Sequence, residues 1–515
     1  MKKIVILFLF CLTFIISSCS IQSIVSQESI KYENYTDDVR YDDTIFYKNH
    51  STIVGADPSV ITVGDEYYLY VTNADGISDC SYIQAYKTKN LTDWEWIGRV
   101  FVPDRDAWAV SSLWAPEVIE KDGKFYMYYS GYDTNTSRMG IGLAVSDSPS
   151  GPFKEFEGTL ADGTVIDKTV SPFTAALISY DENFKVIDPS PFIDDNGRVY
   201  LYVSQDQVRG QSSVYGMELE NDMASIKVDT ITGPLVKPSL DWENPTASSK
   251  WNEAPFMYKH DGKYYLLYSA NYYASSLYSI GYAVSDSPLG KFVKDENPLL
   301  SSKEDWPYIS GPGHCSIFPS VDKKEYYIAY HSHIDVEKGG SVRKINFDKI
   351  SYVDGTLNVN GPSITPQLLP SGSGVYQNIT SLATISAKVS DTELLTDGVV
   401  NTSFDLIEER ELLFESSTKI TFEFDSEVNI IAVMVYDSAA YEYSLDSYKL
   451  EFSMGAIENV YSNSSYKYID EFGYEIKYAA VANIIQFEGV KTNKVTLTFP
   501  KGVAISEIII VGGSK

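Results

Sequence analysis

The chain has 515 residues, which is too long for one ordinary domain and enough for two. Its 70 acidic against 41 basic residues give a formal net charge of −29, which argues against a nucleic-acid partner because such a partner needs a basic face. Aromatic residues make up 14% of the chain, which favours strands and flat surfaces on which sugar rings stack.

The N-terminal segment has the layout of an export signal. Two lysines precede an apolar run over residues 4–16, which is short for a membrane span and suits a secretory signal. The next residues resemble a bacterial lipobox, which implies a lipid on Cys19. We predict a lipoprotein signal peptide over 1–19, a polar tether over 20–44, and anchoring to the cell envelope on its periplasmic or outer face. A plain cleaved signal is the alternative.

The chain carries few cysteines for an exported protein. Cys80 and Cys315 remain once the signal is removed and Cys19 is lipidated, and two cysteines form no disulfide framework. We expect two buried free thiols, although pairing stays open if the first and last repeats are neighbours in a ring.

From residue 45 to 365 one pattern occurs five times, namely a short motif followed by a tyrosine-rich strand pair with a turn. The motifs are Asp57-Pro58-Ser59-Val60, Ala115-Pro116-Glu117-Val118, Asp188-Pro189-Ser190-Pro191-Phe192, Glu253-Ala254-Pro255-Phe256 and Gly313-His314-Cys315-Ser316. A period of about 60 to 70 residues with strand–turn–strand content is typical of a radial β repeat, in which residues at one phase converge on an axis.

The composition changes to proline, serine and glycine around residues 366–374, which suits a domain boundary. Beyond it the tyrosine-rich repeat is absent, and runs such as 430–436 and 505–511 predict an antiparallel β-sandwich over 376–515. We find no amphipathic pattern for a helix longer than ten residues. The whole chain is therefore predicted to be all-β.

Three acids in the repeats have the residue types that glycosidic bond cleavage needs, a proton donor and a carboxylate that activates water or attacks carbon. Asp57 and Glu253 head repeats one and four, so a closed ring would bring them across a central cavity. Asp188 heads repeat three, at what the spacing suggests is an equivalent phase. The apolar neighbours of Glu253 would raise its pKa, and Asp188 would raise it further or orient the acid.

Residues from about 50 to 365 resemble glycoside hydrolase family 43, whose members are five-bladed β-propellers. The resemblance rests on three motifs in order, Ala56-Asp57-Pro58-Ser59, Val186-Ile187-Asp188-Pro189-Ser190-Pro191-Phe192 and Trp251-Asn252-Glu253-Ala254-Pro255-Phe256. It implies that Asp57 is the general base, that Asp188 tunes and orients the acid, and that Glu253 is the general acid. It also implies inversion at the anomeric carbon.

Two further residues are carried over from the same resemblance. His314, in Gly311-Pro312-Gly313-His314, resembles a histidine that faces calcium or another cation on the propeller axis; a buried hydrogen-bonded histidine is the alternative. Arg343 resembles an arginine that contacts the sugar or the base, but Val342 stands where glycine is usual. A surface arginine is therefore the alternative.

Three tryptophans are predicted to contact substrate. Trp114 heads repeat two and could form a platform for a sugar ring. Trp108 and Trp251 are candidates for the pocket wall, with packing inside a blade as the alternative. Glu117 is left outside the catalytic set, with a structural role expected.

In the C-terminal region, residues 394–402 resemble a loop of discoidin-like (coagulation factor 5/8 type) domains, and residues 505–510 resemble their closing strand. The resemblance implies a structural calcium at Asp397. Whether this region binds glycan or only packs stays open.

The resulting hypothesis is a monomeric, exo-acting, inverting glycoside hydrolase that releases α-L-arabinofuranosyl or β-D-xylosyl residues from plant polysaccharide. The chemistry requires no cofactor, and calcium would be structural only. An exo-β-1,3-galactosidase or an endo-arabinanase on the same scaffold is the first alternative, decided by loops 104–113, 162–176 and 205–213. The alternative of another class is a non-catalytic glycan-binding surface lipoprotein.

Overall fold

The computed structural model describes residues 30–35, 41–49, 53–73, 80–244, 246–302, 309–353, 355–462, 467–469, 475–477 and 481–513. The predicted signal peptide, the lipidation site Cys19 and residues 20–29 and 36–40 of the predicted tether lie outside these ranges. No helix within the described ranges is long and apolar enough to span a bilayer.

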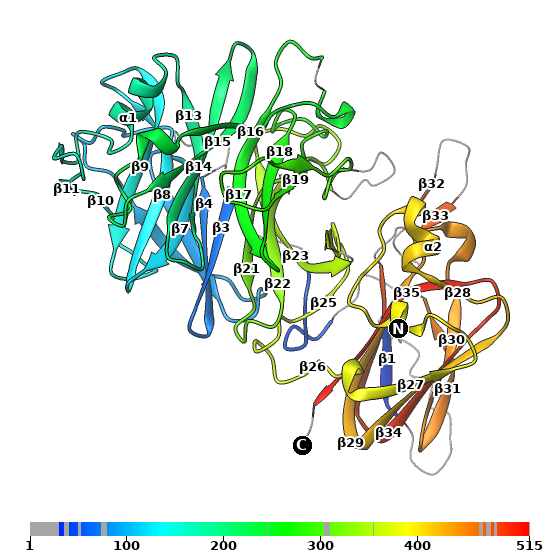
Figure 1. Cartoon of the computed structure of the whole chain (residues 1–515). Coiled ribbons are helices and arrows are strands. Elements are labelled where there is room, and N and C mark those ends of the chain that lie inside the picture. The colour runs from blue at the N-terminus through cyan, green and yellow to red at the C-terminus, as the bar shows by residue number, and fades with distance from the viewer. Residues whose placement is uncertain are drawn as a thin grey trace, which may run out of the picture.

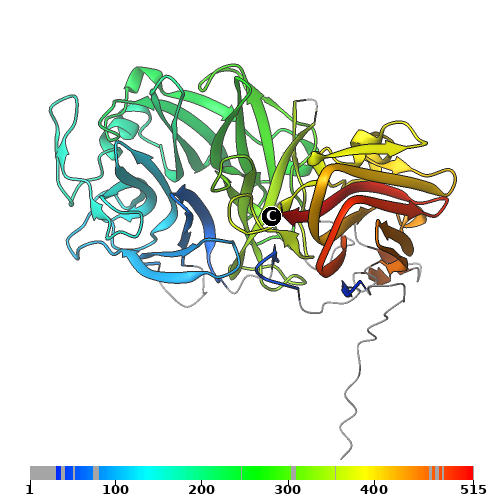
Figure 2. The same ribbon diagram turned by 90° about the horizontal axis from the view of Figure 1, so that it is seen from below.

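Five antiparallel sheets of four strands each follow one another along the chain and form a ring (Figure 1 and Figure 2). Blades one and two comprise β3 (Ala56–Val63), β4 (Glu66–Thr72), β5 (Ile83–Thr88) and β6 (Glu95–Phe101), then β7 (Trp114–Lys121), β8 (Lys124–Asp133), β9 (Arg138–Ser146) and β10 (Lys154–Glu155). Blades three and four comprise β13 (Val186–Ile193), β14 (Val199–Val208), β15 (Gln211–Leu219) and β16 (Thr232–Val236), then β17 (Asn252–His260), β18 (Lys263–Ala270), β19 (Ser279–Ser285) and β20 (Val293–Lys294). Blade five comprises β21 (Gly313–Pro319), β22 (Tyr326–His333), β23 (Arg343–Val353) and β24 (Thr356–Val359).

The innermost strand of each blade contacts that of the next, and β21 of blade five contacts β3 of blade one, which closes the ring. The prediction of a five-bladed β-propeller is confirmed. The connection between blades two and three carries β11 (Gly158–Thr159), β12 (Val165–Ile166) and α1 (Thr174–Tyr180). The short 3₁₀ turn η1 (Val228–Thr230) lies within blade three, between β15 and β16, and η2 (Asp241–Glu243) connects blades three and four.

The tyrosine-rich second strands are buried on both faces because each blade is packed between two others. In β4, Tyr68 and Tyr70 pack with blade two, whereas Tyr67, Leu69 and Val71 pack with blade five. Successive side chains of a strand point to opposite faces, so an uninterrupted run of large apolar residues fills two interfaces at once.

The C-terminal region folds into a sheet-rich unit that matches the predicted β-sandwich (Figure 1). Its long strands are β29 (Thr418–Asp437), β34 (Ala482–Phe499) and β35 (Ala504–Gly513), and β29 pairs with both others. The remaining elements are β26 (Gln377–Asn378), η3 (Thr380–Leu382), β27 (Ala383–Ala387), η4 (Thr392–Leu395), η5 (Phe404–Leu406), α2 (Ile407–Arg410), β28 (Leu412–Leu413), η6 (Tyr441–Tyr443), β30 (Ser447–Phe452), β31 (Gly455–Tyr461), β32 (Lys467–Ile469) and β33 (Glu475–Lys477).

Two segments that were predicted to be connectors form strands instead. Within the predicted tether, β1 (Tyr32–Tyr35) pairs with β34 of the C-terminal sheet, so this part of the tether prediction is corrected. The predicted boundary at 366–374 contains β25 (Gln367–Leu368), which pairs with β2 (Phe46–Tyr47). Tyr32 of β1 and Leu368 of β25 bury apolar surface against neighbouring hydrophobic clusters, which stabilises the two strands. Local composition does not reveal such packing. Cys315 is the buried free thiol that was predicted, whereas Cys80 is only half-buried, which corrects the prediction of burial for that residue.

Candidate active site

Each inner strand begins with a bulge, and the bulge contains one residue in the left-handed region of backbone conformation. These residues are Asp57 (φ 52°), Ala115 (φ 47°), Asp188 (φ 55°), Ala254 (φ 53°) and His314 (φ 46°). Such a conformation costs about 1–3 kcal/mol in a residue other than glycine and persists only where surrounding contacts hold it. The strain lies at the same place in all five blades.

The contact that holds each bulge is also repeated. The backbone N–H of the left-handed residue donates to a side chain in the second strand of the preceding blade. The acceptors are Thr72 Oγ1 (2.7 Å, from Ala115), Ser130 Oγ (2.9 Å, from Asp188), Ser204 Oγ (3.1 Å, from Ala254), Ser269 Oγ (2.8 Å, from His314) and His331 Nδ1 (3.1 Å, from Asp57). Histidine replaces the hydroxyl where the ring closes.

This geometry corrects the predicted phase of the acids. Asp57 and Asp188 occupy equivalent left-handed positions, but the equivalent residue in blade four is Ala254, so Glu253 stands one residue earlier. Glu117 stands two residues after its left-handed neighbour Ala115. Because successive side chains of a strand point to opposite faces, spacing alone could not reveal a shift of one residue.

The three acids nevertheless line one cavity of about 450 Å³ at the start of the inner strands. Asp57, Asp188 and Glu253 are each 8% exposed. The other lining residues are Thr72, Asn73, Cys80, Trp114, Ile187, Asp206, Trp251, Tyr272, Tyr273, Tyr278, His314, Ser341 and Arg343. The predicted residues Trp114, Trp251, His314 and Arg343 therefore all lie at the cavity.

Asp57 is surrounded by groups that favour its ionised form. Thr72 Oγ1 donates to Oδ2 at 2.7 Å, and Arg343 Nη1 donates to Oδ1 at 3.2 Å. Nδ1 of His314 and Nδ1 of His331 lie 3.3 and 3.4 Å from Oδ1. Burial pushes the pKa of Asp57 upward, but His314 and Arg343 outweigh burial and hold that pKa well below its ordinary value.

Arg343 is the permanent charge in this group, because burial lowers the pKa of His314 and His331. The guanidinium also lies over the ring of Tyr273, 4.9 Å from its centroid. The predicted contact between Arg343 and Asp57 is therefore present despite Val342 in front of the arginine.

Glu253 and Asp188 differ from Asp57, because their surroundings raise the pKa of each carboxyl. Burial and then the charge of Asp188 raise the pKa of Glu253 well above its ordinary value. Burial and then the charge of Asp57 raise the pKa of Asp188 to about 8. Asp188 Oδ2 accepts the backbone N–H of Ala254 at 3.0 Å, which ties it to the residue that follows Glu253. The cavity thus holds one strongly acidic carboxyl beside two that favour protonation.

Tyr278 joins the two sides of the cavity. Its hydroxyl donates to Glu253 Oε1 at 3.1 Å, and its ring stacks on His331 with centroids 5.6 Å apart and planes 8° apart. A Cβ at position 313 would overlap the Tyr278 ring, so Gly313 leaves the space in which this ring lies. The glycine before His314 therefore has a steric reason.

Trp251 and a hairpin of blade three form one part of the cavity wall. The centroid of the Trp251 ring lies 5.4 Å from that of the Tyr272 ring. Lys250, which precedes Trp251, donates its backbone N–H to the Gly210 carbonyl and accepts the backbone N–H of Ser212. Asp206, at the start of the same hairpin, also lines the cavity. Of the three loops expected to shape the pocket, only 205–213 supplies a lining residue.

Trp108 does not line the cavity and is a core residue of blade two. It is 1% exposed, its Nε1 donates to Tyr129 Oη at 3.1 Å, and the two rings stack. The predicted substrate contact is corrected to packing, because burial of so large a ring between blades outweighs a place at the surface.

Neither predicted calcium site is supported by clustered ligands. Within the described ranges there is no group of three or more histidine, cysteine, aspartate or glutamate side chains placed to hold a metal ion. The His331 Nδ1 accepts an N–H, so the neutral ring carries its proton on Nε2, which excludes that atom as a ligand. Asp397 accepts the Val399 N–H at 2.9 Å. Calcium at His314 and at Asp397 stays a prediction, and no chemical step below depends on it.

Sequence reasoning missed Tyr278, His331 and Asp206. A signal for His331 was present, because each second strand contains a small hydroxyl residue or histidine directly after a large apolar residue. The pairs are Val71-Thr72, Tyr129-Ser130, Val203-Ser204, Tyr268-Ser269 and Tyr330-His331. Tyr278 and Asp206 have no counterpart in the other repeats, so periodicity could not single them out.

Comparison with known proteins agrees with this geometry. Residues 51–357 match the model of glycosyl hydrolases family 43. A crystal structure of a thermostable family-43 glycoside hydrolase is 37% identical, covers 63% of this chain and 99% of its own, and superposes with a TM-score of 0.55.

Three curated relatives match the same region. A β-D-galactofuranosidase of Aspergillus niger is 27% identical over 54% of this chain and 73% of its own length. An extracellular endo-α-(1→5)-L-arabinanase of Thermotoga petrophila is 25% identical over 54% of this chain and 64% of its own. A xylosidase/arabinosidase of Butyrivibrio fibrisolvens is 27% identical over 59% of this chain and 54% of its own. The family match over more than half of the chain and the five-bladed ring around three buried acids place this protein in glycoside hydrolase family 43.

Proposed function

We propose that this glycoside hydrolase is an exo-acting, inverting enzyme that releases α-L-arabinofuranosyl or β-D-xylosyl residues from plant polysaccharide. The observation that carries the proposal is the cavity in which Asp57 is held ionised while Glu253 is held protonated. A carboxylate and a carboxylic acid in one aromatic-walled cavity are the two groups that glycoside hydrolysis requires.

In this mechanism Asp57 accepts a proton from the water that attacks the anomeric carbon. Arg343 and Thr72 keep its carboxylate ionised and oriented. Glu253 donates its proton to the departing glycosidic oxygen, so that no alkoxide has to leave. Asp188 fixes the adjacent backbone through Ala254, and because two carboxyls in one buried cavity resist carrying two negative charges, its presence raises the pKa of Glu253.

The sugar and the mode of action are proposed from the cavity and the relatives together. A volume of about 450 Å³ with tryptophan and tyrosine walls suits the end of a glycan chain. The relatives are named for furanosidase, xylosidase and arabinosidase activities, which favours a pentose or furanose ring. One relative is an extracellular endo-arabinanase, and an endo mode is the second candidate. That relative also supports export, for which we propose the lipid anchor at Cys19.

A substrate panel tests the proposal. Wild-type protein is assayed on aryl α-L-arabinofuranoside, aryl β-D-xyloside, aryl β-D-galactoside, aryl β-D-galactofuranoside and linear arabinan. We expect the highest kcat/KM on the arabinofuranoside or xyloside, with single sugars as the first product from the polymer. Release of oligosaccharides from arabinan, with no cleavage of the aryl glycosides, would establish the endo mode. Inactivity on every substrate together with glycan binding would favour the non-catalytic lipoprotein.

Arg343→Gln is expected to move the acidic limb of the pH profile of kcat/KM to higher pH. Asp57 acts only when ionised, and removal of the guanidinium raises its pKa, so activity is lost at a higher pH as the solution is acidified. We expect a shift of about one pH unit, because an arginine beside an aspartate lowers the pKa of the aspartate by about 1–3 units. A lower kcat with an unmoved acidic limb would contradict this role.

Tyr278→Phe is expected to move the basic limb upward. The Tyr278 hydroxyl donates to Glu253 and so favours the ionised form, which means that its removal raises the pKa of Glu253 further. The acid then stays protonated to higher pH, with a shift of about one unit for a hydrogen bond to a charged group. A basic limb that moves downward or stays in place would show that this hydrogen bond does not set the pKa of the acid.

A further inference from the structure

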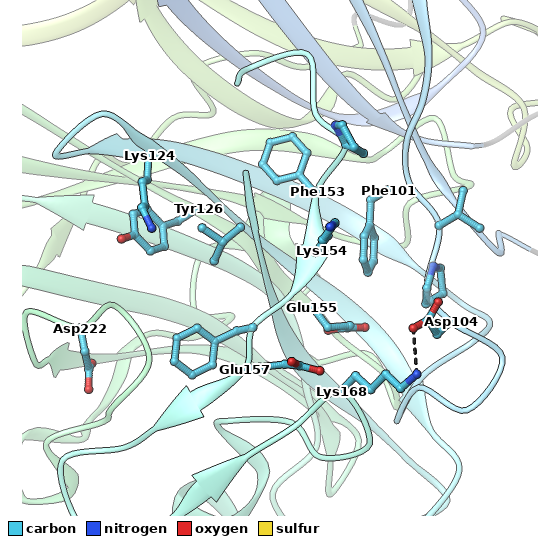
Figure 3. A pocket seen from close by; sticks show the side chains of 15 residues that line it. Phe101, Asp104, Lys124, Tyr126, Phe153, Lys154, Glu155, Glu157, Lys168 and Asp222 are labelled. Carbon is cyan, nitrogen blue, oxygen red and sulfur yellow. Dashed lines mark hydrogen bonds and ion pairs between the residues drawn. The ribbon is translucent and has the colours of Figure 1, made fainter. Parts of the chain in front are cut away.

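A second cavity, of about 760 Å³, lies on the side of the propeller and shares no lining residue with the catalytic cavity. It lies between the end of β6 and the outermost strand of blade two, β10 (Figure 3). We call it the blade-two groove, and its lining residues are 101–104, 152–157, Lys124, Tyr126, Val145, Lys168 and Asp222. The groove is larger than the catalytic cavity, and the proposed reaction does not use it.

Aromatic rings form much of the lining. Tyr126 and Phe156 are partly exposed, and Phe101 and Phe153 are buried beside them. The flat face of an exposed ring is the surface on which the C–H face of a sugar stacks. Figure 3 shows the rings of Tyr126, Phe153 and Phe101 in the upper part of the view, with the carboxylates of Glu155 and Glu157 below them.

Glu155 is a half-buried carboxyl that lines the groove. It accepts a hydrogen bond of 2.7 Å from Tyr129 Oη, and it forms no ion pair with any residue in the described part of the chain. Burial raises its pKa to about 7. Tyr129 and Trp108 are the hydrogen-bonding side chains beside this carboxyl, and hydroxyl groups of a ligand in the groove would add hydrogen bonds to its partly exposed side.

The charges around the groove nearly cancel. The lining contains three lysines (Lys124, Lys154 and Lys168) and four acids (Asp104, Glu155, Glu157 and Asp222). Asp104 forms an ion pair with Lys168 at 2.9 Å. The whole chain is strongly acidic, so this balance is local. A site with rings, polar groups of both signs and little net charge favours a neutral ligand that is rich in hydroxyl groups over an anion or a cation.

We propose that the blade-two groove binds a segment of neutral polysaccharide at a distance from the catalytic cavity. The identity of that glycan rests on the proposed function, because the same polymer would occupy both sites. Binding through two sites on one chain raises the effective concentration of the polymer at the catalytic cavity without changing the chemical step.

The test compares small and polymeric ligands. Tyr126→Ala/Lys154→Ala removes a ring and an exposed amine, and Glu155→Gln keeps the shape and the Tyr129 contact. Trp96→Ala is the matched control, because Trp96 is 57% exposed on β6 but lies outside the groove. Each change is made in wild type for kinetics and in Glu253→Gln for calorimetry with xylo-oligosaccharides and arabino-oligosaccharides.

In the Glu253→Gln background we expect two oligosaccharide sites per chain. One of them is lost or weakened about tenfold by Tyr126→Ala/Lys154→Ala, as removal of a stacking ring predicts, and it is also weakened by Glu155→Gln, which removes a carboxylate acceptor for sugar hydroxyl groups. In the otherwise wild-type protein, kcat/KM on an aryl glycoside stays within about twofold, while KM on the polymer rises, as loss of a second attachment predicts. A single site in Glu253→Gln, or equal losses in Trp96→Ala, would overturn the proposal. If no aryl glycoside is cleaved, the proposed function fails, but calorimetry still decides whether the groove binds glycan.

Discussion

Glu253→Gln is expected to lower kcat/KM on an oligosaccharide by about 10³-fold, within the range that a positioned general acid contributes. Glutamine has nearly the shape of the acid but no proton to give to the glycosidic oxygen. A dinitrophenolate leaves without protonation, so the loss on a dinitrophenyl glycoside should be less than about tenfold. The ratio of the two losses is measured in parallel assays of wild type and variant.

Glu117→Gln is the matched control for this experiment. Glu117 is also buried, and burial raises its pKa well above its ordinary value, but it does not line the cavity. The Glu117→Gln variant should cleave both substrates as fast as wild type does. Equal losses on the two substrates in Glu253→Gln would show that Glu253 does not protonate the leaving group.

Asp57→Asn is expected to lower kcat/KM by about 10³-fold or more on every substrate, whatever the leaving group. An amide cannot accept the proton of the attacking water, and water has to attack even when the leaving group departs easily. The two variants are thereby separated, since the loss depends on the leaving group only for Glu253. Calorimetry with an oligosaccharide checks that Asp57→Asn still binds glycan.

A large residual activity of Asp57→Asn on the dinitrophenyl glycoside would contradict the role of Asp57 as base. Thr72 and Arg343 would lose a charged partner in this variant, so its thermal unfolding is compared with that of wild type. A folded but inactive variant is the predicted result.

The sequence was sufficient to predict the propeller and the acids, because both depend on local repeats. Five strand pairs rich in tyrosine predict blades, and acids beside proline at the strand starts predict an inward-facing site. That Ala254 and not Glu253 takes the left-handed position in blade four depends on where the bulge lies, and a bulge changes side-chain direction without an obvious sequence signal.

The remaining parts of the site depend on contacts between distant segments. Tyr278 reaches Glu253 because Gly313, in the next blade, leaves space for its ring. Trp108 carries the same apparent signal as Trp114, but only the packing of blade two shows that it is buried. The pairing of β1 with β34 joins residues near opposite ends of the chain, and local composition contains no information on such a pair.

The central claim is that Asp57 and Glu253 act as base and acid with water between them. The most direct test is to measure by proton NMR, before mutarotation is complete, the anomeric configuration of the sugar that is first released. A base and an acid that act with water between them predict inversion, so an α-L-arabinofuranoside should give β-L-arabinose first. Release of α-L-arabinose first from the α-L-arabinofuranoside would mean retention through a covalent intermediate, and it would contradict the assignment of Asp57 as the general base.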